Sequence, residues 1–161
     1  EKWHERKSRV TDIEGTRNSR WRVQSLVTAY NRVIVADYLD GRIGTLSDEA
    51  YTDYGEEIGR DISTLPFSNM SKPIFFPMLE LTVESGVGDN ATPEPKITML
   101  RSKDGKTWTA PRLRTLGAKG KYGHRVVWRR NGRADRFEIF RFQMSDHVRH
   151  VLIKLEADVL G

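Results

Sequence analysis

The fold is decided by Arg125-Val-Val-Trp-Arg-Arg-Asn-Gly-Arg-Ala-Asp-Arg-Phe137 and, further along, Val151-Leu-Ile-Lys-Leu-Glu156. An Asn-Gly pair interrupts the first segment, and this pair is typical of a tight turn between antiparallel strands. In the second segment Val151, Ile153 and Leu155 share one face, because the side chains of a strand alternate between its two sides. The two segments therefore predict an antiparallel β structure.

The same pattern extends outward on both sides of the deciding stretch. A half-buried strand is predicted within residues 74–84, and further strands at 96–101, 107–112, 124–130, 136–144 and 149–158. Six antiparallel strands over about 95 residues suit a β-sandwich. We therefore predict that residues 65–161 form an antiparallel β-sandwich-like domain, after a break rich in Pro, Ser and Asn.

The first part of the chain predicts a second all-β domain, residues 1–64. Residues 1–20 are polar and predict a loop that leads into the first strand, with Trp3 as its anchor. Four short strands follow, separated by Asn or Asp-Gly turns, at 21–30, 32–38, 42–46 and 58–64. Four such strands form a β-meander that resembles one blade of a β-propeller. One blade needs neighbours to cover its faces, so this domain is predicted to be a partial propeller.

Length and composition place the chain among globular proteins. Its 161 residues are 37% hydrophobic and 30% charged, which is enough for one domain or two small ones with a packed core. The chain has no cysteine, which excludes disulfides and thiolate metal sites. No run approaches the roughly 18 apolar residues of a membrane span, and no signal peptide opens the chain. The first residue is Glu, which indicates a fragment or a processed product.

The net charge of +5 is unevenly distributed, and the excess of positive charge lies between Arg101 and Arg136. Such a segment is typical of a surface that binds nucleic acid or an acidic protein surface. The predicted contact surface consists of five arginines: Arg125, Arg129, Arg130, Arg133 and Arg136. Residues 47–84 lean acidic, so a neighbouring subunit is a candidate partner as well as DNA. A solvated outer face of a strand is the simpler alternative.

A turn precedes the basic segment, Ser102-Lys-Asp104-Gly105-Lys-Thr107-Trp108. It is similar to the Asp-box turn of sialidases and other propellers, but lacks one residue between Asp and Gly. The Asp carboxylate is expected to accept backbone N–H groups, and Gly to adopt positive φ. We assign the turn a structural role and expect Trp108 to fill the core together with Trp128 and Phe137.

No pattern indicates a catalytic, metal or cofactor-binding site. The histidines are His4, His124, His147 and His150. His147 and His150 are three residues apart on a predicted extended segment, which places them on opposite faces. No nucleophile elbow, P-loop or dinucleotide fingerprint is present. We therefore predict a protein that is not an enzyme, with no catalytic residues, no metal and no cofactor.

Several segments, in order, resemble one family: the packaged-DNA stabilisation protein in the tails of short-tailed bacteriophages. They are Trp3-His-Glu-Arg6, Arg20-Trp-Arg-Val23, Ala36-Asp-Tyr-Leu-Asp-Gly-Arg42, Tyr51-Thr-Asp-Tyr-Gly55, Leu79-Glu-Leu-Thr-Val-Glu-Ser-Gly-Val-Gly88 and the region from Arg101 to Leu160. They correspond to roughly the last third of a family member. Two departures are the shortened Asp-box-like turn and His147, where the family usually has Pro.

The resemblance implies a structural protein of the virion tail, made in the host cytoplasm, that closes the portal channel after DNA packaging. It implies a ring, with six copies as the family expectation. The expected partners are other copies of the chain, the portal adaptor, the tail needle and, as a further candidate, the packaged DNA; no membrane is expected. Two alternatives from the residues are a carbohydrate-binding or sialidase-like β module and a DNA-binding domain.

Overall fold

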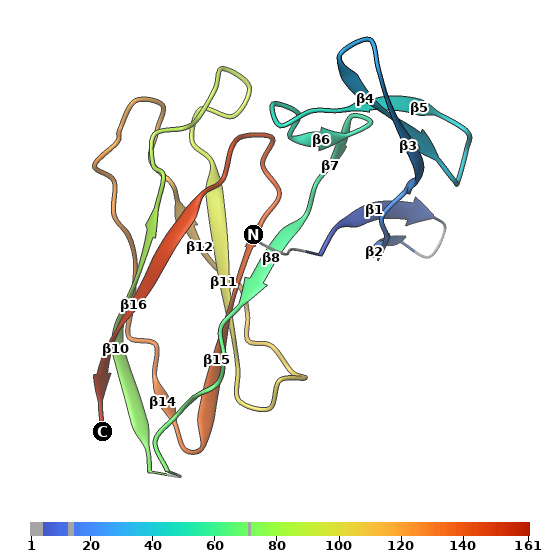
Figure 1. Ribbon diagram of the computed structural model, residues 1–161. Helices are drawn as coiled ribbons and strands as arrows, with labels where there is room; N and C mark the ends of the chain where they lie inside the picture. Colours follow the sequence, from blue (N-terminus) through green and yellow to red (C-terminus); the bar gives the residue numbers. More distant parts are fainter. Residues whose placement is uncertain (1–4, 13–14, 71) are drawn as a thin grey trace. The chain divides into compact units, whose positions relative to one another are not determined.

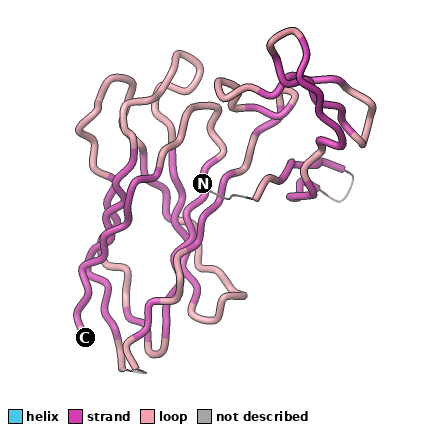
Figure 2. Tube along the Cα trace, viewed as in Figure 1, coloured by secondary structure: helices cyan, strands magenta, loops and turns pink. Residues whose placement is uncertain are grey.

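The computed structural model describes residues 5–12, 15–70 and 72–161, and the chain is built from β-strands joined by turns and loops (Figures 1 and 2). The all-β fold class is thereby confirmed. In the described ranges no helix is long and apolar enough to cross a membrane. The chain divides into two compact units, Glu1–Gly59 and Arg60–Gly161, which we call the N-terminal and C-terminal units.

The strands of the N-terminal unit are β1 (Lys7–Asp12), β2 (Gly15–Arg20), β3 (Val23–Ala29), β4 (Arg32–Asp37), β5 (Ile43–Leu46), β6 (Thr52–Asp53) and β7 (Glu56–Glu57). Those of the C-terminal unit are β8 (Arg60–Ser63), β9 (Phe67–Ser68), β10 (Ile74–Val83), β11 (Lys96–Ser102), β12 (Arg112–Thr115), β13 (Val126–Arg129), β14 (Arg133–Ala134), β15 (Phe137–Met144) and β16 (Leu152–Leu160).

The C-terminal unit consists of two antiparallel sheets (Figure 1). In the first sheet β10 is central, with β16 on one side and β13 and β14 on the other. The second sheet has the order β12-β11-β15-β8, and β9 also pairs with β15. Alternate residues of β15 are buried, as expected for a strand with one face toward the core.

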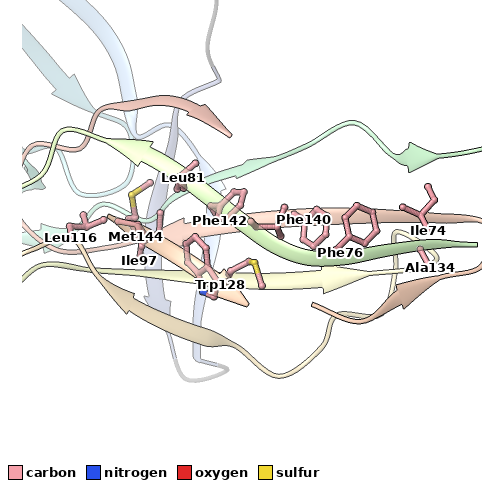
Figure 3. Close-up of a cluster of buried hydrophobic side chains, with 13 residues drawn as sticks. Ile74, Phe76, Leu81, Ile97, Leu116, Trp128, Ala134, Phe140, Phe142 and Met144 are labelled. Atoms are coloured by element: carbon pink, nitrogen blue, oxygen red, sulfur yellow. The ribbon is translucent and has the colours of Figure 1, made fainter. Parts of the chain in front are cut away.

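An apolar core lies between these sheets (Figure 3). Its thirteen buried members are Ile74, Phe76, Leu79, Leu81, Ile97, Met99, Leu116, Val126, Trp128, Ala134, Phe140, Phe142 and Met144. The rings of Phe76 and Phe140 pack edge to face at 5.2 Å between centroids, and Phe67 packs on both. The indole of Trp128 is fully buried, and its Nε1 donates a hydrogen bond of 3.0 Å to the Arg112 carbonyl.

An irregularity in β10 keeps apolar side chains on the core face along the whole strand. Ile74 and Phe76 are buried in its first half, and Leu79 and Leu81 in its second, so the buried positions change from even to odd numbers. The pairing with β16 shifts register between Phe75 and Met78, which is where the change occurs. A β-bulge of this kind reverses the side-chain alternation of the strand.

The N-terminal unit contains a three-stranded sheet, β3-β4-β5, and two small two-stranded sheets, β1-β2 and β6-β7. Tyr30 and Asn31 join β3 to β4 with φ values of 53° and 56°, which is the geometry of a type I′ hairpin turn. The prediction of a loop over residues 1–20 was wrong, because Lys7–Asp12 and Gly15–Arg20 pair as a hairpin. The predicted anchor, Trp3, lies outside the described residues. The propeller blade stays a prediction.

The predicted fourth strand of the meander belongs to the C-terminal unit. β8 pairs with β15, with Ser63 opposite Arg141 and Arg60 opposite Met144. The pairing with residues about eighty positions away explains why the C-terminal unit starts at Arg60. The strand predicted at 107–112 was also misplaced, since β12 begins at Arg112.

Candidate functional site

Four of the five predicted contact arginines gather at the β13–β14–β15 turns. Arg129 ends β13, Arg130 lies in the following turn, Arg133 is in β14, and Arg136 precedes β15; all four are exposed. Arg133 pairs with Asp135 at 2.7 Å. Arg129, Arg130 and Arg136 have no ion-pair partner among the residues that the structure describes. The turns therefore present positive charge that the described residues leave largely uncompensated.

The turn between β13 and β14 is held rigidly against β10. The backbone N–H groups of Arg130 and Asn131 donate to the carbonyls of Pro77 and Phe76 at 2.8 and 3.0 Å. The Asn131 side chain is fully buried, and its amide nitrogen donates to the Trp128 carbonyl at 3.0 Å. Gly132 has a φ of 81°, a conformation that favours glycine. Arg130 thus projects from a fixed backbone.

Arg125 stands apart from the other four. It lies before β13, whereas Arg129 lies at the end of that strand. Its guanidinium binds the Glu80 carboxylate in β10 through two hydrogen bonds, one of which is 2.7 Å long from Nε to Oε1. This bond is the main reason that the pKa of Glu80 lies below its ordinary value. The charge of Arg125 is therefore largely neutralised within the first sheet.

Two arginines that the sequence did not single out join the edges of the two sheets. Arg112 Nη2 donates to the Arg129 carbonyl at 2.7 Å, and Arg114 Nε donates to the Val127 carbonyl at 2.9 Å. These bonds run from β12 to β13, which belong to different sheets. Burial, followed by the nearby charges of Arg114 and Arg101, lowers the pKa of Arg112. In the sequence, the signal for these bonds was the alternate spacing of Arg112 and Arg114, which places both side chains on the same face of a strand.

The Asp-box-like turn has the hydrogen bonds expected of a structural turn. Asp104 Oδ1 accepts the backbone N–H groups of Lys106 and Thr107, each at 2.8 Å. The Thr107 hydroxyl donates to Asp104 Oδ2 at 2.6 Å, and these bonds hold the pKa of Asp104 well below its ordinary value. Ser102 Oγ accepts from the Gly105 N–H at 2.8 Å, and Gly105 has a φ of 74°.

Trp108 does not fill the core as predicted. It is partly exposed, and the guanidinium of Arg141 lies over its ring at 3.7 Å from the centroid. The reason is that residues 103–111 form a turn and a connecting segment rather than a strand, so the position of the side chain does not follow the alternation. Trp128 is a core residue, and Phe137 is partly buried.

The histidines form no metal site in the part of the chain that the structure describes, where no group of three or more potential ligands occurs. His4 lies outside the described residues. His150 Nδ1 is 2.8 Å from the Val148 carbonyl. Burial, reinforced by the charge of Arg60, lowers the pKa of His150 to about 4. This histidine is held neutral by its surroundings at physiological pH.

Comparison with protein families gives a match to the family described as Bacteriophage P22 Gp10, beta-sandwich, over residues 59–160. The chain belongs to this family. The match covers the C-terminal unit almost completely and includes every arginine of the predicted contact surface. It confirms the family and the β-sandwich predicted from the sequence. A comparison with curated proteins found no match.

Membership of the P22 Gp10 family makes this chain a bacteriophage structural protein and a component of the virion. The matched region starts beside Arg60, where the compact C-terminal unit begins. The family thus corresponds to a structural unit with its own apolar core and its own charged surface. The N-terminal unit lies outside the match, apart from its last residue.

Proposed function

We propose that the chain is a tail protein that stabilises packaged DNA by closing the portal channel. In this proposal several copies form a ring, with six as the expected number, and the ring contacts the portal adaptor and the tail needle. The mechanism is steric and electrostatic and includes no chemical step. The observation that carries it is the family match over a unit whose turns expose uncompensated arginines.

The arginines at the β13–β14–β15 turns are the proposed contact residues. The backbone of the β13–β14 turn is fixed by hydrogen bonds to β10, so little backbone entropy is lost there when a partner binds. Arg129, Arg130 and Arg136 carry most of the contact, and Arg133 and Arg125 contribute less because they pair with Asp135 and Glu80. The Asp-box-like turn supports the unit and makes no chemical contribution.

The test is a phage that carries Arg129→Glu together with Arg130→Glu. We expect particles that fill with DNA and then lose it, with at least a tenfold loss of infectious titre. The matched control is Lys119→Glu with Lys121→Glu, an equal change of charge on the exposed β12–β13 loop. Normal DNA retention in the arginine variant would contradict the proposal.

Direct binding of DNA is a second candidate, favoured by four exposed arginines within eight residues, 129–136. Neutralisation of about four phosphates would make the affinity fall by roughly two orders of magnitude between about 50 and 200 mM salt. A titration of the purified chain with short duplex DNA at both salt concentrations tests this. Binding that is feeble even at low salt would assign the arginines to contacts with protein.

A further inference from the structure

The arginines adjoin exposed apolar side chains at one end of the C-terminal unit. Met70 is 95% exposed, Leu160 58% and Phe75 47%. Phe75 lies opposite Leu160 in the β10–β16 pair and opposite Arg133 in the β10–β14 pair. The Arg133 guanidinium lies 5.8 Å from the centre of the Phe75 ring. Phe75, Leu160 and Arg133 therefore lie side by side in the first sheet.

The loop that carries Met70 lies beside the end of β16. A methyl group added to Gly161 would lie 3.0 Å from the side-chain nitrogen of Asn69, so the end of β16 contacts the residue before Met70. Met70 itself has a φ of 42°, which is uncommon for a residue with a side chain. We call this surface the arginine–apolar end; it comprises Met70, Phe75, Arg130, Arg133, Arg136 and Leu160.

The composition of the arginine–apolar end fits a protein partner better than a nucleic acid. Phosphate groups require positive charge and gain nothing from an exposed methionine or leucine beside it. Protein interfaces, in contrast, are enriched in Met, aromatic residues and Arg. Single exposed apolar side chains are ordinary, but adjacent ones bordered by charge indicate an interaction site.

The chain carries a segment of complementary charge in its N-terminal unit. From Ile43 to Glu57 the sequence has five carboxylates, namely Asp48, Glu49, Asp53, Glu56 and Glu57, and neither Lys nor Arg. Ile43 is 76% exposed and Leu46 36%. Of the five carboxylates, Glu57 is paired with Arg9 at 2.7 Å, while Asp48, Glu49 and Glu56 are exposed. We call residues 43–57 the acidic segment.

We propose that the arginine–apolar end of one copy of the chain binds the acidic segment of a second copy. Opposite charges meet at the rim of this contact, and the apolar side chains of both surfaces are buried at its centre. The two surfaces are different, so the contact is heterologous and each copy can bind two others. This inference rests on the proposed ring and names the surfaces that form it.

The experiment is sedimentation of the purified chain over a range of concentrations, near physiological salt. We expect the chain to self-associate. Arg130→Glu with Arg133→Glu should weaken self-association at least a hundredfold, and so should Glu49→Lys with Glu56→Lys. A mixture of these two variants should associate again, because each retains one intact surface and the two reversed surfaces attract each other. Lys119→Glu with Lys121→Glu should leave the association unchanged.

A second pair of substitutions tests the apolar part without any change of charge. Met70→Ser with Leu160→Ser should weaken self-association at least tenfold, and circular dichroism should show an unchanged fold because both side chains are more than half exposed. If the arginine–apolar end binds DNA instead, this variant should leave self-association unchanged. The chain should then form a salt-dependent complex with duplex DNA. That outcome, or a chain that stays monomeric at its highest soluble concentration, would overturn the proposal.

The failure of this inference is distinguishable from failure of the proposed function. If the reversals leave self-association intact but phage particles lose their DNA, the arginines act in the tail on another partner, and only this inference fails. If the reversals abolish self-association but particles retain their DNA, the contact between copies stands, and the role in DNA retention fails.

Discussion

The two units of the chain bury different kinds of side chain. The C-terminal unit buries thirteen apolar residues in one cluster. In the N-terminal unit Val35 is the only buried apolar side chain among those that the structure describes, and Arg22 and Asp37 are buried as an ion pair. The comparison shows that one unit is organised by the hydrophobic effect and the other by charge and hydrogen bonds.

The ion pair in the N-terminal unit is part of a larger polar network. Arg22 also binds Asp40 at 2.9 Å, and Arg42 binds Asp40 at 2.6 Å. The hydrogen bond from Arg42 is the main reason that the pKa of Asp40 falls to about 2. The guanidinium of Arg42 lies 4.6 Å from the ring centre of Tyr54. Such a network adds less net stability than an apolar core of the same size.

The largest effect is expected in the C-terminal unit. Trp128→Ala should lower the free energy of unfolding by about 3–5 kcal/mol, because it leaves a cavity in the cluster and removes the hydrogen bond to Arg112. Hydrogen exchange should accelerate in β10, β13 and β15. Tyr122→Ala, at a side chain that is 79% exposed, is the control and should change little. Equal effects of both substitutions would argue against the core described here.

In the N-terminal unit, the substitution expected to have the largest effect is Asp37→Asn. It should cost about 3 kcal/mol, because it leaves the buried charge of Arg22 without its closest partner. Hydrogen exchange measured by mass spectrometry should accelerate in β3 and β4 and stay unchanged in β10 and β15. Asp40→Asn, where the side chain is 42% exposed, should cost less. A larger cost for Asp40→Asn would show that Asp40, and not Asp37, is the more important partner of Arg22.

A smaller effect is expected from Gly44→Ala in β5. The new methyl group would lie 2.9 Å from the ring of Tyr54, so the ring must shift and its contact with Arg42 weakens. We expect a loss of about 1–3 kcal/mol in the free energy of unfolding of the N-terminal unit. Gly123→Ala, at a position with open space around it, is the matched control. Thermal unfolding of both variants measures the difference.

The smallest effect is expected from the titration of His150. Its pKa is about 4 in the folded chain and 6.5 in a model peptide, so the unfolded chain binds more protons between these values. Stability should therefore fall as the pH drops from 6.5 to about 4. Because the ring is partly exposed, we expect about 1–2 kcal/mol. Denaturant unfolding of His150→Gln should lack this part of the pH dependence; an unchanged profile would refute the assignment.

Local patterns predicted the apolar strands of the C-terminal unit best, and they missed distant pairings and polar strands. The alternation in 136–144 predicted β15 within one residue. The partner of β8 was not predictable, because the strand pattern of residues 58–64 does not indicate whether Ile43–Leu46 or the distant β15 lies beside it. The hairpin β1-β2 was missed because its residues are almost all polar and provide no apolar alternation.

In the candidate site, too, features set by neighbouring residues were predictable from the sequence, and contacts between distant residues were not. The clustering of Arg129, Arg130, Arg133 and Arg136 follows from their closeness in sequence, so it was predictable. The neutralisation of Arg125 was not, because Glu80 is forty-five residues away. The exposed Phe75 and Leu160 are brought together only by the β10–β16 pairing, which no local pattern contains.

The most direct test of the account is photo-crosslinking in assembled particles, with a photoreactive amino acid in place of Arg136. The account predicts a covalent product with another protein subunit, and mass spectrometry should locate the attachment within residues 43–57 of a second copy. The same amino acid in place of Lys121 should give no such product. Crosslinks from position 136 to DNA, or none at all, would contradict the assignment of the C-terminal arginines to contacts between copies.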